Sequence, residues 1–454
     1  MIAATGSSSP GVAIIGMGRT GCSVARFLEA RGIDYVVFDE KLKKLPAGFS
    51  GSLKTGKLQG KKLLDFTRLI VSPGIPWQHP ALKAARDAGV ELLGDLDFFR
   101  ENFHGDLLAV TGTNGKSTVV HLMGQMLEVL PGGVEIAGNI GEPMLNMLAA
   151  PKPSPRAVLE LSSFQLERCQ GVHPRWAALL NIQPDHADMH ANMAEYEAAK
   201  VRLFEQQGEG DIAMLPLDEH WNDLAWGLGE RGVHVRRFGA VQDGSVVDAG
   251  LFGDVGARHI FWTSEGRVHE VAIDQVRVRG EHQHLNLAVA AQAAADSGVS
   301  SSVITESLTA FRGLDHRLRY IAHRAGKPWY DDSKATNPDA AVAALNSFEQ
   351  VIWVCGGLTK GLDLMPMLPV IQKHVALAFV IGVDAKPFAA LLEEAGIAYR
   401  VVTHVDEAVV QAARSNMPLP VLLSPAAASM DQFKDYAERG RCFYEAVAGL
   451  EKSS

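Results

Sequence analysis

The sequence predicts an α/β fold built from three consecutive domains. Short apolar runs typical of buried strands alternate with helical segments along most of the chain. Several of these runs end in glycine-rich turns, as strands of parallel sheets do where they lead into helices. The length of 454 residues corresponds to about three domains of roughly 150 residues. We expect the domains to cover residues 1–96, 97–313 and 314–454.

Composition narrows the class of protein. Hydrophobic residues make up 47% and charged residues 21% of the chain, so a largely disordered protein is excluded. The formal net charge of −9 argues against nucleic-acid binding through bulk positive charge. The four cysteines are scattered without a CxxC pair, and neither a disulfide framework nor a structural zinc site is expected.

No apolar run approaches the roughly 20 residues that span a bilayer. Residues 1–10 lack the basic and apolar regions of a signal peptide. These two observations predict a cytoplasmic protein that does not bind membranes.

The first domain begins with a strand at 12–16, the turn Gly-Met-Gly-Arg-Thr-Gly at 16–21 and a helix at 22–31. A second strand at 35–38 ends at Asp39, and a third at 69–71 runs into Ser72-Pro73-Gly74. The spacing GxGxxG, with an acid about 20 residues further on, fits a site for NAD(P) or another nucleotide diphosphate. An ordinary tight turn is the structural alternative.

The second domain has the strongest local signal, Gly112-Thr-Asn-Gly-Lys-Ser-Thr118, between a strand at 107–111 and a helix that ends near 128. Backbone N–H groups in such a loop, together with the helix dipole, favour phosphate. Lys116 can neutralise the β- and γ-phosphates, and the hydroxyl of Ser117 or Thr118 can bind Mg²⁺. The match to GxxxxGK[ST] is incomplete, because Val110 occupies the position of the first glycine.

Further polar residues follow predicted strands of this domain. Glu160 lies at the end of a strand at 157–161, which suits a Mg²⁺ ligand, and Asp185 and His186 follow a strand at 177–182. Lys200 lies on a helix at 195–206. Singly, each of these residues also fits a turn, a loop or a solvated helix face. Residues 238–279 predict a small β-rich region, and 284–295 predict a helix.

The third domain predicts strands at 351–355, 377–382, 399–402 and 421–423 with Ala-rich helices between them. Three polar turns are prominent: DDSKATNP at 331–338, GGLTKG at 356–361 and SPAAASMDQFK at 424–434. Polar turns at the carboxyl ends of strands in one domain predict a ligand crevice.

In this order, the segments resemble the Mur ligase superfamily of ATP-dependent amide ligases. The resemblance covers essentially the whole chain and is carried by GMGRTG, VSPG, VTGTNGKST, GNIG, LELSSFQLE, Asp-His at 185–186, GLDHR, DDSKATNP, GGLTKG and SPAAASMDQFKDY. The DSKATN segment and the glycine-rich first turn are most similar to the branch that adds D-glutamate to UDP-N-acetylmuramoyl-L-alanine (UDP-MurNAc-L-Ala).

The resemblance implies a Rossmann-like first domain, a central P-loop-type ATP-binding domain and a Rossmann-like third domain. It implies an amide ligase of peptidoglycan precursor synthesis, which forms an acyl phosphate and a tetrahedral intermediate and releases ADP and phosphate. The cofactors would be ATP and two Mg²⁺ ions, with Mn²⁺ as a possible substitute. The partners would be small-molecule substrates, with no nucleic acid and no membrane, and a monomer is expected.

The resemblance also implies roles for individual residues. The sugar nucleotide would be bound by Arg19, Thr20, Asp39, Glu40, Ser72, Gly74, Asn139 and Ser162. ATP would be bound by Gly112, Thr113, Asn114, Gly115, Lys116, Ser117, Thr118, Asn286, Arg317 and Asp332. Lys116, Glu160, His186 and a carbamylated Lys200 would be catalytic, and the metal ligands would be Ser117, Glu160, His186 and Lys200. D-glutamate would be bound by Lys334, Thr336, Lys360, Ser429, Met430 and Tyr436.

Three positions depart from the expected pattern: Gln283 replaces an Asn near adenine, Leu358 lies where some members carry an acid, and Tyr436 replaces a Phe. A nicotinamide-dependent oxidoreductase and a non-catalytic NTP-binding regulator are the alternatives from other classes. A related Mur-type or folylpolyglutamate-synthase-like ligase is the closest one. The three-domain layout also predicts closure about a hinge near Gly313.

Overall fold

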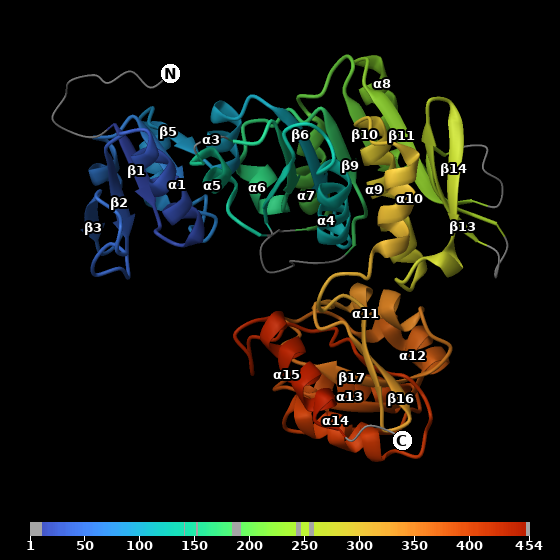
Figure 1. Ribbon diagram of the computed structural model, residues 1–454. Coiled ribbons are helices and arrows are strands. Elements are labelled where there is room, and N and C mark those ends of the chain that lie inside the picture. Colours follow the sequence, from blue (N-terminus) through green and yellow to red (C-terminus); the bar gives the residue numbers. More distant parts are fainter. Residues whose placement is uncertain are drawn as a thin grey trace.

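The computed structural model describes residues 11–139, 141–150, 153–183, 192–241, 247–253 and 258–450. These residues form three α/β domains, each with its own sheet, which confirms the predicted fold class. The first and middle domains lie side by side, and the third domain lies against the middle one (Figure 1). Within the described part of the chain, every helix is too short or too polar to cross a bilayer.

The first domain is a five-stranded parallel sheet in the order β3-β2-β1-β4-β5. Its elements, with α3 leading into the next domain, are β1 (Val12–Ile15), α1 (Arg19–Ala30), β2 (Tyr35–Asp39), β3 (Ser52–Thr55), η1 (Gly60–Leu63), β4 (Arg68–Val71), α2 (Pro80–Asp87), β5 (Glu91–Leu93) and α3 (Asp95–Asn102). The turn after β1 requires glycine, because a Cβ on Gly21 would lie 2.1 Å from the carbonyl oxygen of Gly16. That close contact explains the last glycine of the GxGxxG pattern.

The middle domain has a nine-stranded sheet in the order β14-β13-β12-β11-β10-β9-β6-β8-β7. Its strands and helices are β6 (Asp106–Thr111), α4 (Lys116–Leu127), β7 (Glu135–Gly138), α5 (Met144–Leu148), β8 (Arg156–Glu160), α6 (Ser163–Arg168), β9 (Trp176–Leu179), α7 (Met193–Val201), η2 (Arg202–Phe204), β10 (Ile212–Pro216), η3 (Glu219–Trp221), α8 (Asn222–Glu230), β11 (His234–Val241), β12 (Ala249–Phe252), β13 (His259–Ser264), β14 (Arg267–Ala272), η4 (Ile273–Gln275), α9 (Glu281–Asp296) and α10 (Ser301–Ala310). Neighbouring strands of the part β12-β11-β10-β9-β6-β8-β7 pair in parallel. Strand β13 pairs antiparallel with both β12 and β14. The predicted β-rich region is therefore an antiparallel extension of the central sheet.

The third domain has a six-stranded sheet in the order β15-β16-β20-β17-β18-β19, parallel except for the hairpin β15–β16. Its elements are β15 (Arg319–Arg324), β16 (Lys327–Asp331), α11 (Pro338–Leu345), β17 (Val351–Gly356), η5 (Met365–Met367), α12 (Leu368–His374), β18 (Val375–Ile381), α13 (Ala385–Glu394), β19 (Tyr399–Val401), α14 (Val405–Arg414), β20 (Val421–Leu423) and α15 (Tyr436–Ala448). All four strands predicted for this domain are present, whereas the β15–β16 hairpin is an addition.

The first two domains share a hydrophobic core, whereas the third domain has its own. One buried cluster is continuous from β1 and α1 of the first domain, through Phe98 of α3, into β6 and β8 of the middle domain. The third domain has two clusters of its own, one on each face of its sheet. Since a shared core resists relative motion, the first two domains form one packed unit and the third is the separable one.

Candidate active site

A glycine-rich loop joins β6 to α4 at the carboxyl edge of the middle sheet. Gly112 and Gly115 have φ values of 145° and 88°, and a Cβ on Gly115 would lie 2.4 Å from Asn286 Oδ1. Helix α4 begins at Lys116, so its first N–H groups point toward the loop. This arrangement is a binding site for an anion such as phosphate.

The side chain of Lys116 folds over the loop that precedes it. Its Nζ donates hydrogen bonds to the carbonyl oxygens of Gly112 and Thr113, both at 2.7 Å. The ammonium group also lines a cavity in front of the loop. A positive charge is thus held where the helix terminus already favours anions.

Ser117, Glu160, Asn139 and Arg317 form a hydrogen-bonded group beside Lys116. Ser117 Oγ donates to Glu160 Oε2 at 2.5 Å, and Arg317 Nη2 donates to Ser117 Oγ at 2.5 Å. Asn139 Nδ2 donates to the other carboxylate oxygen at 3.1 Å. Arg317 precedes β15, so this group joins the middle domain to the third.

Glu160 is ionised despite being buried. Burial favours its neutral form, but the charges of Lys116 and Arg317 and the hydrogen bond from Ser117 outweigh it and lower the pKa of Glu160. A buried carboxylate beside a hydroxyl is an oxygen-donor pair that suits Mg²⁺. Among the residues that the structure describes, no cluster of three or more His, Cys, Asp or Glu could hold a metal.

Lys200 on α7 reaches the same loop from the other side. It is buried, with Nζ donating to Gly112 O at 2.9 Å and lying 4.6 Å from the ring centroid of Tyr196. Tyr196 Oη in turn contacts Thr113 Oγ1 at 3.1 Å. Asp185 and His186, the other predicted residues of this region, lie outside the described residues.

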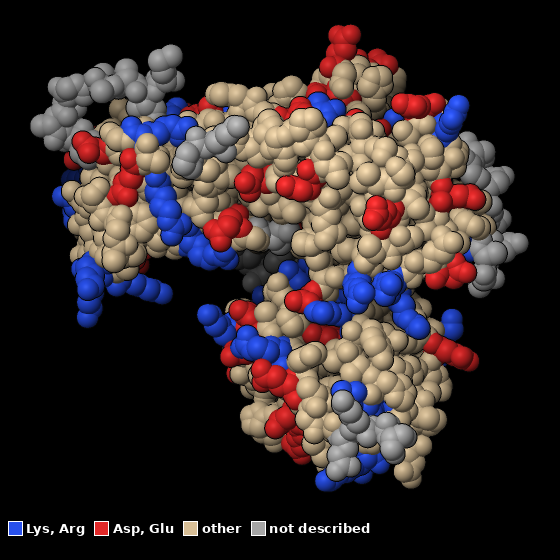
Figure 2. Space-filling model, in the orientation of Figure 1, with Lys and Arg blue, Asp and Glu red and all other residues tan. Residues whose placement is uncertain are grey.

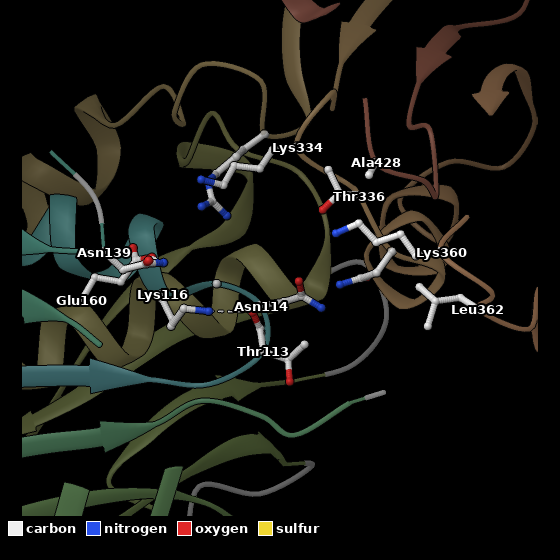
Figure 3. Close-up of a pocket in the computed structure, with 13 residues that line it drawn as sticks. Thr113, Asn114, Lys116, Asn139, Glu160, Lys334, Thr336, Lys360, Leu362 and Ala428 are labelled. Carbon is white, nitrogen blue, oxygen red and sulfur yellow. Dashed lines mark hydrogen bonds between the residues drawn. The ribbon is translucent and has the colours of Figure 1, made fainter. Parts of the chain in front are cut away.

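Two adjoining cavities connect the middle and third domains. The first is shown in Figure 3, where Lys116, Glu160 and Asn139 face side chains of the third domain. Its lining is Thr113, Asn114, Gly115, Lys116, Asn139, Glu160, Arg317, Lys334, Thr336, Asn337, Lys360, Leu362 and Ala428. The structure therefore brings the phosphate loop together with three of the six residues predicted to bind D-glutamate.

Lys334 is a base of this cavity whose pKa is strongly shifted. Its Nζ donates to Tyr436 Oη at 3.0 Å and lies 4.4 Å from the centroid of that ring. Burial and the neighbouring charge of Arg317 lower the pKa of Lys334 to about 8, although Glu160 opposes the shift. Tyr436 thus supplies both a ring face and a hydrogen-bond acceptor.

The other residues predicted to bind D-glutamate differ in burial and in whether they line the first cavity. Thr336 and Lys360 line the first cavity, whereas Ser429 and Met430 are not among its lining residues. Ser429 is buried and Met430 is 63% exposed. Leu358 forms an isolated bridge with Ala428, so its backbone holds this wall of the cavity.

The second cavity lies behind the loop and is more apolar. Phe238, His282, Gln283 and Asn286 contribute to its lining, with Asp332 on the side of the third domain. Burial lowers the pKa of His282 to about 4, so this imidazole is neutral near pH 7. An apolar wall with a few polar groups suits a nucleoside.

Asp332, which is predicted to bind ATP, also braces the third domain. Its two carboxylate oxygens accept hydrogen bonds from Ser424 Oγ at 2.8 Å and from the Leu318 amide at 3.0 Å. Burial raises the pKa of Asp332 to about 7. The carboxyl group thereby positions the turn that carries Arg317.

In the first domain, Asp39 and Ser72 have structural partners of their own. Asp39 accepts hydrogen bonds from the amides of Met17, Lys41 and Leu42 at 2.9, 2.9 and 3.0 Å. Partial burial raises the pKa of this half-buried carboxyl group, but the three hydrogen bonds outweigh burial and lower it. Ser72 Oγ donates to the Gly16 carbonyl at 2.7 Å. Both residues shape the glycine-rich turn after β1.

The other predicted sugar-nucleotide residues are spread along the same border. Arg19 Nη2 donates to the Gly141 carbonyl at 2.8 Å, across the two domains, and the Glu40 carboxylate accepts from the Leu58 amide at 3.4 Å. Ser162 caps α6, accepting from the Gln165 amide at 3.3 Å. Thr20 is half-buried in α1, and Gly74 is exposed after β4. Of the eight residues in this predicted set, Asn139 alone lines the first cavity.

Several residues of the site were not predicted from the sequence. Tyr196 precedes Lys200 by four positions, a helical spacing that places both on one face and could have identified it. Asn181 follows β9 and exchanges hydrogen bonds with the backbone of Asn114, at 2.8 and 3.0 Å. A polar residue inside the apolar run predicted as a strand at 177–182 was the available signal.

Three family models match the chain in the order of its domains. They are the Mur ligase MurD-like N-terminal domain at residues 10–94, the Mur ligase middle domain at 110–294 and the Mur ligase glutamate ligase domain at 316–424. A UDP-N-acetylmuramoylalanine–D-glutamate ligase of Caulobacter sp. strain K31 is 35% identical, over 100% of this chain and 99% of the relative. The enzyme of the same name from Caldicellulosiruptor bescii is 34% identical, over 97% of both chains.

Solved structures agree at the level of the fold. The ligase MurC of Thermotoga maritima has a TM-score of 0.59 at 17% identity and covers 96% of this chain and 98% of its own. MurF of Acinetobacter baumannii has a TM-score of 0.61 at 16% identity, covering 92% of this chain and 98% of its own. With the three domain matches and the full-length relatives above 30% identity, the chain belongs to the Mur ligase family.

Proposed function

We propose that this chain joins UDP-MurNAc-L-Ala to D-glutamate in an ATP-dependent amide ligation, as a monomer in the cytoplasmic synthesis of peptidoglycan precursors. The full-length relatives that carry this printed name support the proposal. The observation that carries it is the first cavity, where the phosphate loop and Glu160 face Lys334, Thr336 and Lys360. We further propose domain boundaries at residues 1–96, 97–313 and 314–454.

The chemistry requires activation of a carboxylate. The alanyl carboxylate oxygen attacks the γ-phosphorus of ATP, which yields an acyl phosphate and ADP. The amine of D-glutamate then attacks the acyl carbon, loses a proton and forms a tetrahedral intermediate that expels phosphate. Lys116 and Arg317 are proposed to stabilise negative charge at the transferring phosphoryl group, since positioning and charge supply most of the rate in such reactions.

Magnesium is the proposed cofactor, and the donor set fits it. Ser117 and Glu160 supply a hydroxyl and an ionised carboxylate 2.5 Å apart, both oxygen donors. When bound, Mg²⁺ would supply a positive charge to the β- and γ-phosphates. Mn²⁺ prefers similar ligands and is a possible substitute.

The second proposed cation site depends on Lys200 and His186. An ammonium group repels Mg²⁺, whereas a carbamate formed from CO₂ and Lys200 Nζ presents oxygen anions. The position of Nζ, buried beside the Gly112 carbonyl, supports this role because a carbamate there would extend toward the phosphate loop.

Asn286, Arg317 and Asp332 are proposed to bind adenosine and phosphates, together with residues 112–118 of the loop. Lys334, Thr336, Lys360, Ser429, Met430 and Tyr436 are proposed to bind D-glutamate, whose two carboxylates suit two lysines. Arg19, Thr20, Asp39, Glu40, Ser72, Gly74, Asn139 and Ser162 are proposed for the sugar nucleotide.

Purified protein incubated with UDP-MurNAc-L-Ala, D-glutamate, ATP and Mg²⁺ tests the proposal. Phosphate release should require both substrates, and mass spectrometry should show the glutamyl product. Replacing D-glutamate with L-lysine or meso-diaminopimelate is the control for a related ligase. Phosphate release that is independent of D-glutamate would contradict the proposal.

Lys200→Ala provides a specific test of the carbamate. We expect activity to fall by about 10³-fold, since a group that holds a catalytic cation is lost, and a short carboxylic acid to restore part of it. Lys373→Ala, on the exposed side of α12, is the control and should keep full activity. Unrescued Lys200→Ala with wild-type activity would remove this residue from the site.

A further inference from the structure

The first domain differs in charge from the rest of the molecule. Residues 11–94 contain 13 Lys and Arg but 7 Asp and Glu, although the whole chain has a formal net charge of −9. The remaining two domains therefore hold the acidic surplus. A positively charged domain in an acidic protein creates a field that distinguishes one end of the molecule from the other.

Most of this positive charge lies in one segment between β2 and β4. We call its seven lysines the basic rim: Lys41, Lys43, Lys44, Lys54, Lys57, Lys61 and Lys62. All seven are exposed, and none is in an ion pair within the part of the chain that the structure describes. The nearby acids Asp39 and Glu40 accept hydrogen bonds from backbone amides, and Asp65 is exposed.

Five lysines of the basic rim follow β2 or lie at the end of β3, at the carboxyl edge of the sheet where the glycine-rich turn lies, and Lys61 and Lys62 lie in η1. Strand β3 pairs in parallel with β2, and Thr55 lies opposite Asp39, so Lys54 near the end of β3 and Lys57 just after it lie at the carboxyl edge of the sheet. The Asp39 carboxylate binds the Met17 amide of the glycine-rich turn at that same edge. Figure 2 shows Lys and Arg side chains projecting from the lower side of this domain, into the open space beside the third domain.

We propose that the basic rim attracts the anionic sugar nucleotide to the first domain before the ligand contacts its binding residues. This inference rests on the proposed function, which assigns a pyrophosphate and a carboxylate to the substrate of this domain. Exposed lysines act on such a ligand through their field over about 10 Å, without fixed contacts. Steering of this kind raises association rates by about 10- to 10³-fold at low salt.

The other two substrates provide an internal comparison. ATP and D-glutamate are anions too, but their proposed sites lie between the middle and third domains. The basic rim should therefore affect capture of the sugar nucleotide more than capture of either of them. An effect of the protein's net charge alone would change the capture of all three substrates to the same extent.

The test compares two double variants that lower the net charge equally. K54E/K57E changes the basic rim, and K373E/K386E changes exposed lysines of α12 and α13 in the third domain. At low salt we expect K54E/K57E to lower kcat/KM for UDP-MurNAc-L-Ala about 10-fold with kcat unchanged, and the gap to close near 0.5 M salt. K373E/K386E should stay within about twofold of wild type, as expected for charges beyond the screening length.

The proposal would be overturned if both double variants lowered kcat/KM for UDP-MurNAc-L-Ala equally. It would also be overturned if kcat/KM of K54E/K57E depended on salt as strongly as that of the wild type. The proposal would also be overturned if the wild type bound vesicles containing phosphatidylglycerol and K54E/K57E lost this binding while keeping the wild-type kcat/KM. That result would indicate that the basic rim binds an anionic bilayer. Thermal unfolding monitors whether each variant is folded. If the wild type released no D-glutamate-dependent phosphate at any salt, the proposed function would fail instead, which is a distinguishable result.

Discussion

Two neighbouring hydroxyls on α4 show how a single residue acquires a role. Ser117 Oγ lies between Glu160 and Arg317, at 2.5 Å from each partner. Thr118 Oγ1, one position later, is buried and has no hydrogen-bond partner among the described residues. Helical geometry turns adjacent side chains about 100° apart, so only the Ser117 hydroxyl reaches Glu160.

Replacing these hydroxyls separately tests the proposed cation ligand. Ser117→Ala should raise the Mg²⁺ concentration needed for half-maximal activity by about 10-fold, because one oxygen donor is lost. Thr118→Val keeps the shape of the side chain and is the matched control. We expect it to change the Mg²⁺ concentration needed for half-maximal activity very little. Mg²⁺ titrations of phosphate release measure both, and equal effects of the two substitutions would argue against the assignment.

Lys334 makes D-glutamate binding dependent on pH. With its pKa lowered to about 8, Lys334 loses its charge as the pH rises from 7 to 9, whereas an unperturbed lysine stays protonated over this range. A neutral amine attracts a carboxylate less, so we expect KM for D-glutamate to rise about 3- to 10-fold over that interval.

The control is KM for UDP-MurNAc-L-Ala in the same buffers, which should change less because Lys334 is not proposed to bind it. Initial rates at several pH values give both constants. A KM for D-glutamate that stays constant up to pH 9 would contradict the role of Lys334.

Among the elements, α6 joins the first and middle domains. Arg168 at its end donates to the Ser72 carbonyl at 3.3 Å and lies 5.8 Å from the Trp77 ring centroid. Gln165 in the same helix donates to Asp95 at 3.4 Å. Burial raises the pKa of Asp95, and the charge of Arg168 partly opposes this shift.

Arg168→Met should therefore disturb the Ser72 loop without reaching the first cavity. We expect KM for the sugar nucleotide to rise about fivefold with kcat little changed. The free energy of unfolding should fall by about 1–3 kcal/mol, because a buried polar group loses its partner. Arg168→Lys, which keeps the charge, should restore part of both.

Arg175→Met is the matched control, because Arg175 pairs with Asp106 at the surface and is 37% exposed. Steady-state kinetics and thermal unfolding measure the effects. A loss of kcat alone in Arg168→Met would indicate a role in the chemistry rather than in positioning the loop.

At the scale of the whole molecule, the shared core and the separate third domain determine what can move. Gly313, between α10 and β15, has φ 80°, and contacts across this junction include the hydrogen bond from Arg317 to Ser117. A few polar contacts are easier to rearrange than a continuous apolar cluster.

We therefore expect the third domain to rotate as a rigid body near Gly313 when nucleotide binds, while the first two domains keep their arrangement. Crystal structures with and without a nucleotide, and solution scattering under the same conditions, measure this rotation. One unchanged orientation of the third domain in both states would contradict the hinge.

Much of the architecture was predictable because it is locally encoded. Strands such as 107–111 and 421–423 are short apolar runs, and the phosphate loop is contiguous, so its spacing is visible in the chain. The β15–β16 hairpin was missed although Ala325 and Gly326, both with positive φ, form its turn. Strand β15 is largely exposed or half-buried and has a mixed composition, so it lacks the alternation of apolar and polar residues that indicates a strand.

The sequence by itself determined the order of the domains, the phosphate loop and the family, because these depend on contiguous motifs and on the alternation of strands and helices. The tertiary structure decided which candidates meet. Only the fold brings Ser117 within reach of Arg317, 200 positions later, and lowers the pKa of Lys334 by burial beside that arginine. Distances and burial of this kind are set by packing between distant segments, so no local pattern contains them.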